Sequence, residues 1–110
     1  MLKARFFMNS SMEEILAKKC CGLWDQNLEV HVENAGPKEV FIHSRLTLLG
    51  GGPDLVIKNL YPPGGWTLAP GRTGAFYCYL DPVLWKKYQA VVLMDGQGKR
   101  HRFPIRDQGA

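Results

Sequence analysis

The sequence lacks the signatures of a membrane span, of a disulfide-stapled domain and of a secretory leader. No apolar run approaches the roughly 18 to 20 residues that a helix needs to cross a bilayer. The three cysteines are an odd number without regular spacing, so a disulfide framework is not expected. The opening MLKARFF is followed at once by polar residues, whereas a secretory signal needs a longer apolar stretch. These absences predict a cytoplasmic protein with buried thiols.

Catalytic motifs are also absent. The chain contains no G-x-S-x-G, H-E-x-x-H or P-loop string, and its glycines 50–52 lack the Lys-Ser/Thr that phosphate binding requires. Its histidines, His31, His43 and His101, are scattered over separate stretches with charged neighbours, which is typical of solvated surface positions. A reaction needs a proton carrier close to a second polar group. We therefore expect a non-enzymatic protein without a cofactor.

The candidate metal ligands are poorly spaced. Cys20, Cys21 and Cys78 together with one histidine would supply four zinc ligands. However, adjacent cysteines on a helix point about 100° apart, whereas structural zinc sites use pairs separated by two to four residues. A copper site would need Cys, His and Met close together, and Met94 and His101 are distant from Cys78. No metal site is expected.

From Leu28 to Ile105 the chain alternates between apolar and polar residues in the two-residue period of β-strands. Leu28, Val30 and Val32, for example, can face a core while the residues between them face water. Gly, Pro, Asn and Asp interrupt this pattern every 8 to 12 residues or so, which indicates turns and favours an antiparallel sandwich. The strongest turn is Asp95–Gly98, which predicts a hairpin. The predicted strands, about seven, span residues 27–33, 39–49, 55–60, 66–68, 73–80, 88–94 and 99–105.

Two helical segments are expected. Ser10 and Ser11 precede Glu13 and Glu14 by three residues, the spacing of a capping box, and Gly22 is a suitable stop for the helix that follows. Asp81 and Pro82 predict the cap and first residue of a single helical turn through Trp85. The expected organisation is a tail and helix over residues 1–26, a β-sandwich domain over 27–106 and a disordered tail over 107–110.

Three strings resemble small bacterial immunoglobulin-like domains: N-A-G-P-K-E-V-F-I-H-S-R-L, W-T-L-A-P-G with F-Y-C-Y-L-D-P, and Y-Q-A-V-V-L-M-D-G-Q-G-K-R-H-R-F-P-I. In those domains a strand pair precedes an L-x-P-G turn and a closing hairpin. The resemblance covers roughly Leu28 to Ile105 and implies an immunoglobulin-like sandwich, but no activity. Members of that group often carry an N-terminal membrane anchor, where this chain has its predicted helix instead.

Protein binding is the function that such a scaffold serves most readily, through its loops or an edge strand. The segment 61–85 contains more large rings than one face of a small core needs, and exposed Tyr and Trp are typical interface anchors. We predict an interaction site at Tyr61, Trp66, Tyr77 and Tyr79. The alternative is that these rings fill the core. The helix stripe of Met12, Ile15 and Leu16 is a second possible docking surface, for a partner or a dimer mate.

The alternative function is weak nucleic-acid binding. The net charge is +4, a mild basic excess that favours acidic partners without reaching the charge density of dedicated nucleic-acid proteins. Its most concentrated basic run is Lys99, Arg100, His101 and Arg102 at the predicted hairpin, where contacts to phosphates are feasible. Exposed charges on a hairpin also protect an edge strand from aggregation. The sequence therefore favours a protein-interaction or structural module and names no partner.

Overall fold

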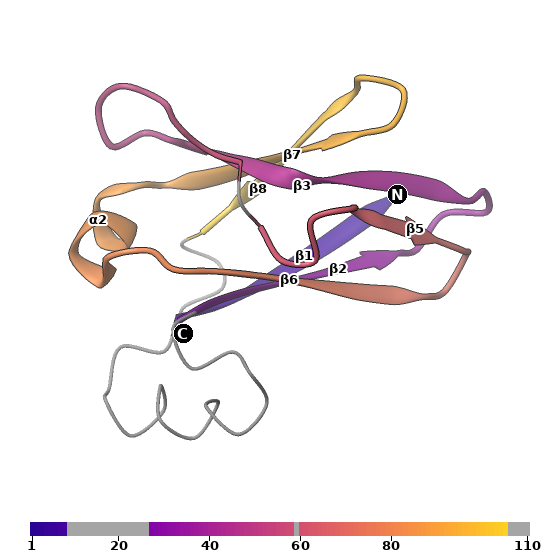
Figure 1. Cartoon of the computed structure of the whole chain (residues 1–110). Helices are drawn as coiled ribbons and strands as arrows, with labels where there is room; N and C mark the ends of the chain where they lie inside the picture. Colours follow the sequence, from indigo (N-terminus) through magenta and orange to yellow (C-terminus); the bar gives the residue numbers. More distant parts are fainter. Residues whose placement is uncertain (9–26, 59, 106–110) are drawn as a thin grey trace, which may run out of the picture.

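Strand β2 (Leu28–Asn34) shows the alternation that organises the fold. Leu28, Val30 and Val32 are completely buried, and the residues between them are partly exposed. A sheet that buries one face needs a second layer to cover that face. The chain supplies this layer as a second sheet, and Figure 1 shows the two sheets lying one above the other.

The computed structural model describes residues 1–8, 27–58 and 60–105. One sheet, sheet A, has the strand order β1-β2-β6, and the other, sheet B, has the order β4-β3-β7-β8 with β5 paired to β3 as well. All of these strand pairs are antiparallel. The prediction of a mostly β, antiparallel fold is therefore confirmed. In addition to β2, the elements are β1 (Leu2–Met8), β3 (Val40–Leu49), β4 (Leu55–Ile57), β5 (Trp66–Leu68), β6 (Thr73–Cys78), α2 (Pro82–Lys87), β7 (Ala90–Asp95) and β8 (Arg100–Pro104).

The first residues form a strand, which corrects the expectation of a tail before residue 27. β1 pairs with β2 along its whole length, from Leu2 opposite Asn34 to Met8 opposite Leu28. Ala4 and Phe6 of β1 are buried in the core. The sandwich therefore includes residues 2–8. Leu2, Ala4 and Phe6 alternate with polar residues, but Phe7 and Met8 interrupt this alternation and a polar segment follows, so the sequence alone does not distinguish a strand from a tail.

Two other expectations lie outside the described residues. These are the helix of residues 10–22, with its stripe of Met12, Ile15 and Leu16, and the tail of residues 107–110. Within the described ranges, no helix is long and apolar enough to cross a membrane.

Local sequence signals place several of the remaining elements as expected, whereas β4 ends at Ile57, before the predicted end at residue 60. β5 has the predicted bounds, and β7 and β8 flank the predicted turn at Asp95–Gly98. The cap of α2 is also confirmed, since the Asp81 carboxylate accepts a hydrogen bond from the Val83 amide at 2.9 Å and Pro82 occupies the first helical position.

The core between the sheets contains residues from both layers: Leu28, Val30, Val32 and Phe76 from sheet A, and Ile42, Leu46, Leu48, Val91 and Leu93 from sheet B.

A buried asparagine fixes the chain where β6 ends. Asn27 is 1% exposed. Its side-chain amide donates to the Leu80 carbonyl at 2.8 Å, and its side-chain oxygen accepts from the Leu80 amide at 2.8 Å. Both backbone groups of Leu80 are thus bonded to one side chain. This explains why strand pairing stops at Cys78, before the predicted end at residue 80.

Replacing Asn27 with alanine should lower the free energy of unfolding by about 2 to 4 kcal/mol, because two backbone groups of Leu80 lose their partner in a buried place. Urea unfolding followed by circular dichroism measures this change. The matched control is Ser44→Ala, which removes an exposed hydrogen bond of 2.8 Å to the Pro63 carbonyl and should cost about 1 kcal/mol or less. Equal costs for the two variants would contradict a special role for Asn27.

Candidate protein-interaction site

The predicted aromatic residues gather around the end of β6. Tyr77 belongs to β6, and Tyr79 lies two residues after it. Tyr61 pairs with Tyr77 through two backbone hydrogen bonds, each 2.8 Å long. The indole nitrogen of Trp66 donates to the Ala75 carbonyl at 2.7 Å. Tyr61 and Trp66 therefore both approach the edge of β6 that faces away from β2.

Alternation along β6 decides where its tyrosines point. Phe76, Cys78 and Leu80 are buried, so Tyr77 and Tyr79 lie on the opposite, outer side of sheet A. Tyr79 is 65% exposed and Tyr61 is 52% exposed, whereas Tyr77 is partly covered. The alternative in which these rings fill the core does not hold for Tyr61 and Tyr79.

Trp66 has a structural contact that the other rings lack. It opens β5 in sheet B, yet its indole donates to Ala75 in sheet A. Its ring also lies against the backbone of Gly74, where an added Cβ would be 2.8 Å from Trp66 Cγ. Trp66 thus connects the two sheets where β5 meets β6. It borders the exposed tyrosines and is itself 37% exposed.

Phe7 extends the aromatic surface and was not among the predicted site residues. It lies opposite Glu29 of β2, which in turn lies opposite Tyr77 of β6. Phe7 is 46% exposed, and its ring meets that of His31 edge-on at 5.0 Å. We name Phe7, Tyr61, Tyr77 and Tyr79 the aromatic patch. Reading residues 2–8 as a strand would have placed Phe7 on the outer side of sheet A.

Charged residues lie within and beside the aromatic patch, and Glu29 of β2 stands between Phe7 and Tyr77. The His31 ring lies 3.3 Å from a carboxylate oxygen of Glu29. His31 also lines a cavity of about 650 Å³, together with Phe7, Lys3, Arg5, Glu33 and Thr73. An apolar centre beside a polar border is the usual composition of a protein interface.

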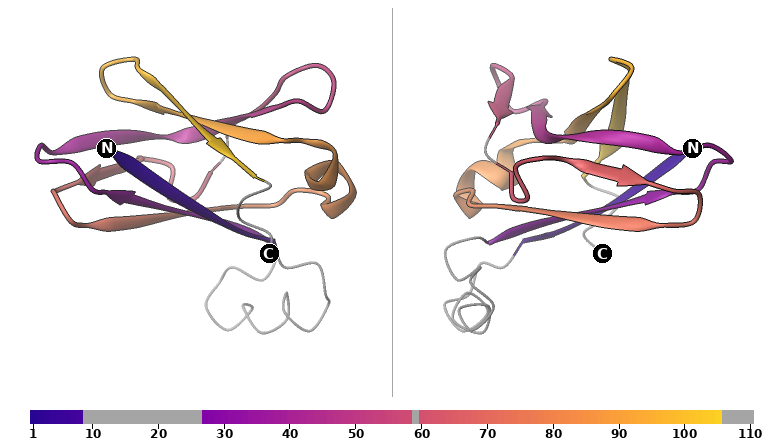
Figure 2. Two further views of the ribbon diagram at one scale, coloured as in Figure 1. Left: turned by 180° about the vertical axis from the view of Figure 1, so that it is seen from behind. Right: turned by 45° about the vertical axis from the view of Figure 1, so that its right-hand side comes forward.

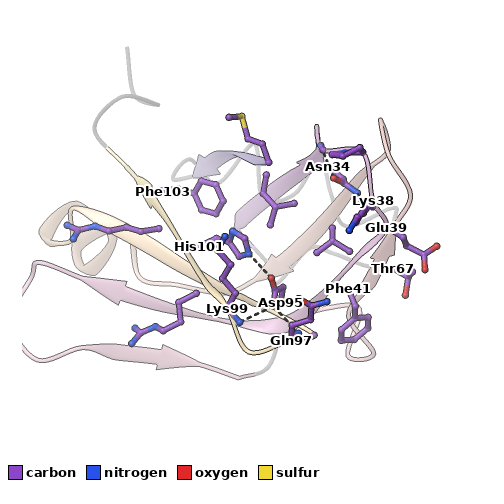
Figure 3. A pocket seen from close by; sticks show the side chains of 18 residues that line it. Asn34, Lys38, Glu39, Phe41, Thr67, Asp95, Gln97, Lys99, His101 and Phe103 are labelled. Atoms are coloured by element: carbon purple, nitrogen blue, oxygen red, sulfur yellow. Dashed lines mark hydrogen bonds and ion pairs between the residues drawn. The ribbon is translucent and has the colours of Figure 1, made fainter.

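The basic run at residues 99–102 does not form one surface. Alternation along β8 leaves Arg100 and Arg102 exposed and turns His101 inward. His101 Nε2 lies 2.9 Å from Asp95 Oδ2, and the His101 side chain is only 19% exposed. The expectation of a solvated surface histidine is therefore wrong for His101. Figure 3 shows this pair beside the backbone of Lys99.

Asp95 is the structural centre of this hairpin. Its Oδ1 accepts hydrogen bonds from the backbone amides of Gln97 and Lys99 at 2.9 and 3.0 Å, and its Oδ2 meets His101. The bond with His101 and, to a lesser extent, the two amide bonds lower the pKa of Asp95, while burial opposes this shift. These contacts indicate that Asp95 stabilises the turn between β7 and β8.

A cavity of about 940 Å³ lies between the start of β1, the loop after β2 and the β7–β8 hairpin (Figure 3). His101 and Asp95 line it. Thr67 contributes a hydroxyl to the lining, but it lies on the opposite side of the cavity from His101, so the two side chains are not brought together. The apolar part of its lining includes Leu2, Val40 and Phe103, and Lys38 and Glu39 are charged residues of opposite sign on it. The cavity thus combines an apolar wall with charges of both signs.

The cysteines are the remaining candidates for reactive or metal-binding residues. Cys78 is buried, and burial raises the pKa of its thiol to about 12, so the reactive thiolate is not formed near neutral pH. Cys20 and Cys21 lie outside the described residues. In the part of the chain that the structure describes, no three His, Cys, Asp or Glu side chains are arranged to hold a metal ion.

Comparison of the chain with known protein families, with curated proteins and with solved structures gives no match.

The pH dependence of stability should report the role of Asp95. Because its pKa is lower in the folded state, the unfolding free energy should fall as pH drops from about 3.9, the ordinary Asp value, through the folded pKa. Asp95→Asn lacks this titration, so the difference in stability between the native chain and the variant should shrink as the pH drops.

Urea unfolding at several pH values between neutral and strongly acidic conditions measures this difference. The control Asp54→Asn removes an exposed carboxylate and should leave most of the acid destabilisation in place. A constant difference between the native chain and Asp95→Asn at all pH values would contradict the assignment.

Proposed function

We propose that this protein is a non-enzymatic, immunoglobulin-like β-sandwich module that binds another protein through the aromatic patch. The observation that carries the proposal is the exposure of Tyr79, Tyr61 and Phe7, at 65%, 52% and 46%, on the outer side of sheet A. Tyr61 lies next to Tyr77 at one end of a row across the strands, and Phe7 lies at the other end, beyond Glu29. Large rings left in water are a typical mark of an interaction surface.

The strand order supports the immunoglobulin-like part of the proposal. The first, second and sixth strands form one sheet, and the third, seventh and eighth belong to the other. This is the division of strands A, B and E from strands C, F and G in immunoglobulin domains. At the centres of the second and seventh strands, where antibody domains carry a disulfide, this chain has Val30 and Leu93, which are both fully buried.

The composition of the outer side of sheet A supports a protein as the partner. Tyr side chains provide large apolar area at a low cost in conformational entropy, and their hydroxyls can bond at the border of an interface. Lys3, Arg5 and Glu33 supply charges of both signs next to the aromatic patch. A surface with rings at its centre and mixed charges at its border suits a folded partner.

Removing the two most exposed rings should weaken binding of the partner. Tyr61→Ser and Tyr79→Ser should each raise the Kd about 30-fold, the effect of losing an interface anchor worth about 2 kcal/mol. A photo-crosslinking residue at position 79 identifies the partner, and calorimetry with the purified partner measures the Kd. Sedimentation at several concentrations detects a second copy of the chain as the partner.

The matched control is Val56→Ser, which removes an apolar side chain that is 47% exposed on β4 of sheet B, the sheet without the aromatic patch. It should leave the Kd unchanged. Trp66→Ala should reduce stability as well as binding, since Trp66 bonds the two sheets. An unchanged Kd in both tyrosine variants would refute the aromatic patch.

Nucleic-acid binding is the second candidate, and the outer side of sheet B favours it. The exposed Arg100 and Arg102 lie there opposite Met94 and Val92 of β7, and Arg45 reaches the same surface through a contact of 3.1 Å to Met94 Sδ. Among the described residues, the ion pairs join His31 to Glu29 and His101 to Asp95. The arginines are thus open to phosphates, although His101 is turned away.

Salt distinguishes the two functions. If the arginines contact a single strand, the logarithm of its binding constant should fall with the logarithm of the salt concentration by about 0.7 for each phosphate contacted. Fluorescence anisotropy with an oligothymidylate at two ionic strengths measures this slope. Failure to bind at low salt would remove the second candidate.

A further inference from the structure

We propose that the free edge of β8 is a second docking site, where an acidic, extended segment of a partner protein joins sheet B as an additional strand. This site lies on a different sheet from the aromatic patch and is argued from different contacts, so either proposal can fail without the other. Figure 2 shows β8 as the outermost strand of its layer, on the side of the molecule where β1 is the outermost strand of the other layer.

The backbone geometry shows which groups β8 offers. Within the described residues β8 pairs with β7 alone. The Asp95 amide bonds to the Lys99 carbonyl, and the Ile105 amide bonds to the Gln89 carbonyl. In an antiparallel pair, hydrogen-bonded positions alternate with positions whose N–H and C=O point the other way. The N–H and C=O groups of Arg100 and Arg102 therefore point outward, away from β7.

Pro104 agrees with this assignment. It lies two residues beyond Arg102 and opposite Ala90, at a position whose N–H would also point outward. Proline has no N–H and occurs in sheets where none is needed for the ladder. Pro104 also ends the available edge, so an added strand would bond to β8 at Arg100 and Arg102.

Charge selects the occupant. Arg100 and Arg102 are both exposed, and neither belongs to the ion pairs found in the described residues. If β8 paired with the β8 of a second copy in antiparallel fashion, arginines of the two chains would lie close together on one face and repel one another. The same charges attract Asp or Glu on a neighbouring strand. The edge therefore disfavours self-association and favours an acidic segment.

The two sides of sheet B set the expected sequence pattern of that segment. Side chains of the added strand on the outer side would lie beside Arg100 and Arg102. Those on the inner side would point toward the cavity of about 940 Å³, whose lining includes Leu2, Val40 and Phe103. Because strand side chains alternate between the two faces, the partner segment should alternate acidic and apolar residues.

A synthetic peptide of about eight residues that alternates glutamate and valine tests this proposal, with a lysine-valine peptide of the same length as the control. Titration of the full chain by NMR should show binding of the acidic peptide only. In the bound state, amide exchange of Arg100 and Arg102 should slow at least about tenfold, since their outward N–H groups become hydrogen-bonded.

Two kinds of variant separate the contribution of the arginine charges to binding from the contribution of the backbone hydrogen bonds. Arg100→Glu with Arg102→Glu should weaken the acidic peptide at least about tenfold, whereas Lys86→Glu with Lys87→Glu on α2, a matched change of charge, should have little effect. Arg102→Pro should bind about fivefold more weakly than Arg102→Ala, because it also removes the outward N–H. The ladder with β7 does not use that N–H, so Arg102→Pro should still fold.

If Arg102→Pro does not fold, amide exchange in the native chain still decides the question. Binding of the acidic peptide without slower exchange at Arg100 and Arg102 would overturn strand addition. Equal binding of the two peptides would overturn the selection by charge. An oligothymidylate that binds this edge more tightly than the acidic peptide, and is lost in the Arg100 and Arg102 reversal, would assign the site to nucleic acid instead.

Discussion

The surfaces of this protein depend on one constraint: the backbone N–H and C=O groups at the edges of its sheets need hydrogen-bond partners. A strand at the edge of a sheet has N–H and C=O groups without a neighbouring strand. β6 meets this need through Tyr61, which forms two backbone bonds to Tyr77, and through the indole of Trp66, which bonds to Ala75. Among the described strands β8 pairs with β7 alone, and it carries arginines and a proline along its other edge. One edge is thus covered by aromatic residues and the other is charged.

This difference explains where the two proposed sites lie. Covering the edge of β6 brings the Tyr61 ring next to the tyrosines of β6 and creates an exposed aromatic surface. At β8 the outward N–H and C=O groups lie beside two positive side chains, and the proposed acidic partner rests on this combination. Both proposed sites lie at the edges of sheets whose inner faces are filled with apolar side chains.

Single residues show how far the sequence predicts the fold. Asp81 with Pro82 predicts the start of α2, and Asp95 to Gly98 predicts the hairpin, because caps and turns depend on residues that are neighbours in the chain. The sequence does not predict the edge strand β1, because an alternation over residues 2–8 that is followed by a polar segment does not by itself distinguish a strand from a tail. Nor does it predict the inward turn of His101, because the turn pattern of Asp95 to Gly98 does not show that the Asp95 carboxylate also bonds to His101.

The sequence by itself determined the two-residue alternation of the strands, the positions of the turns and the number of aromatic side chains, since these are properties of the chain within a few residues. Only the tertiary structure decided that Tyr61 joins Tyr77, that Trp66 connects the two sheets, and that Phe7 lies in the same row as Tyr77. It also decided which backbone groups of β8 point away from β7. The physical reason is that strand pairing and the packing of one sheet on the other join residues far apart in the chain, and their order depends on the whole core rather than on any local pattern.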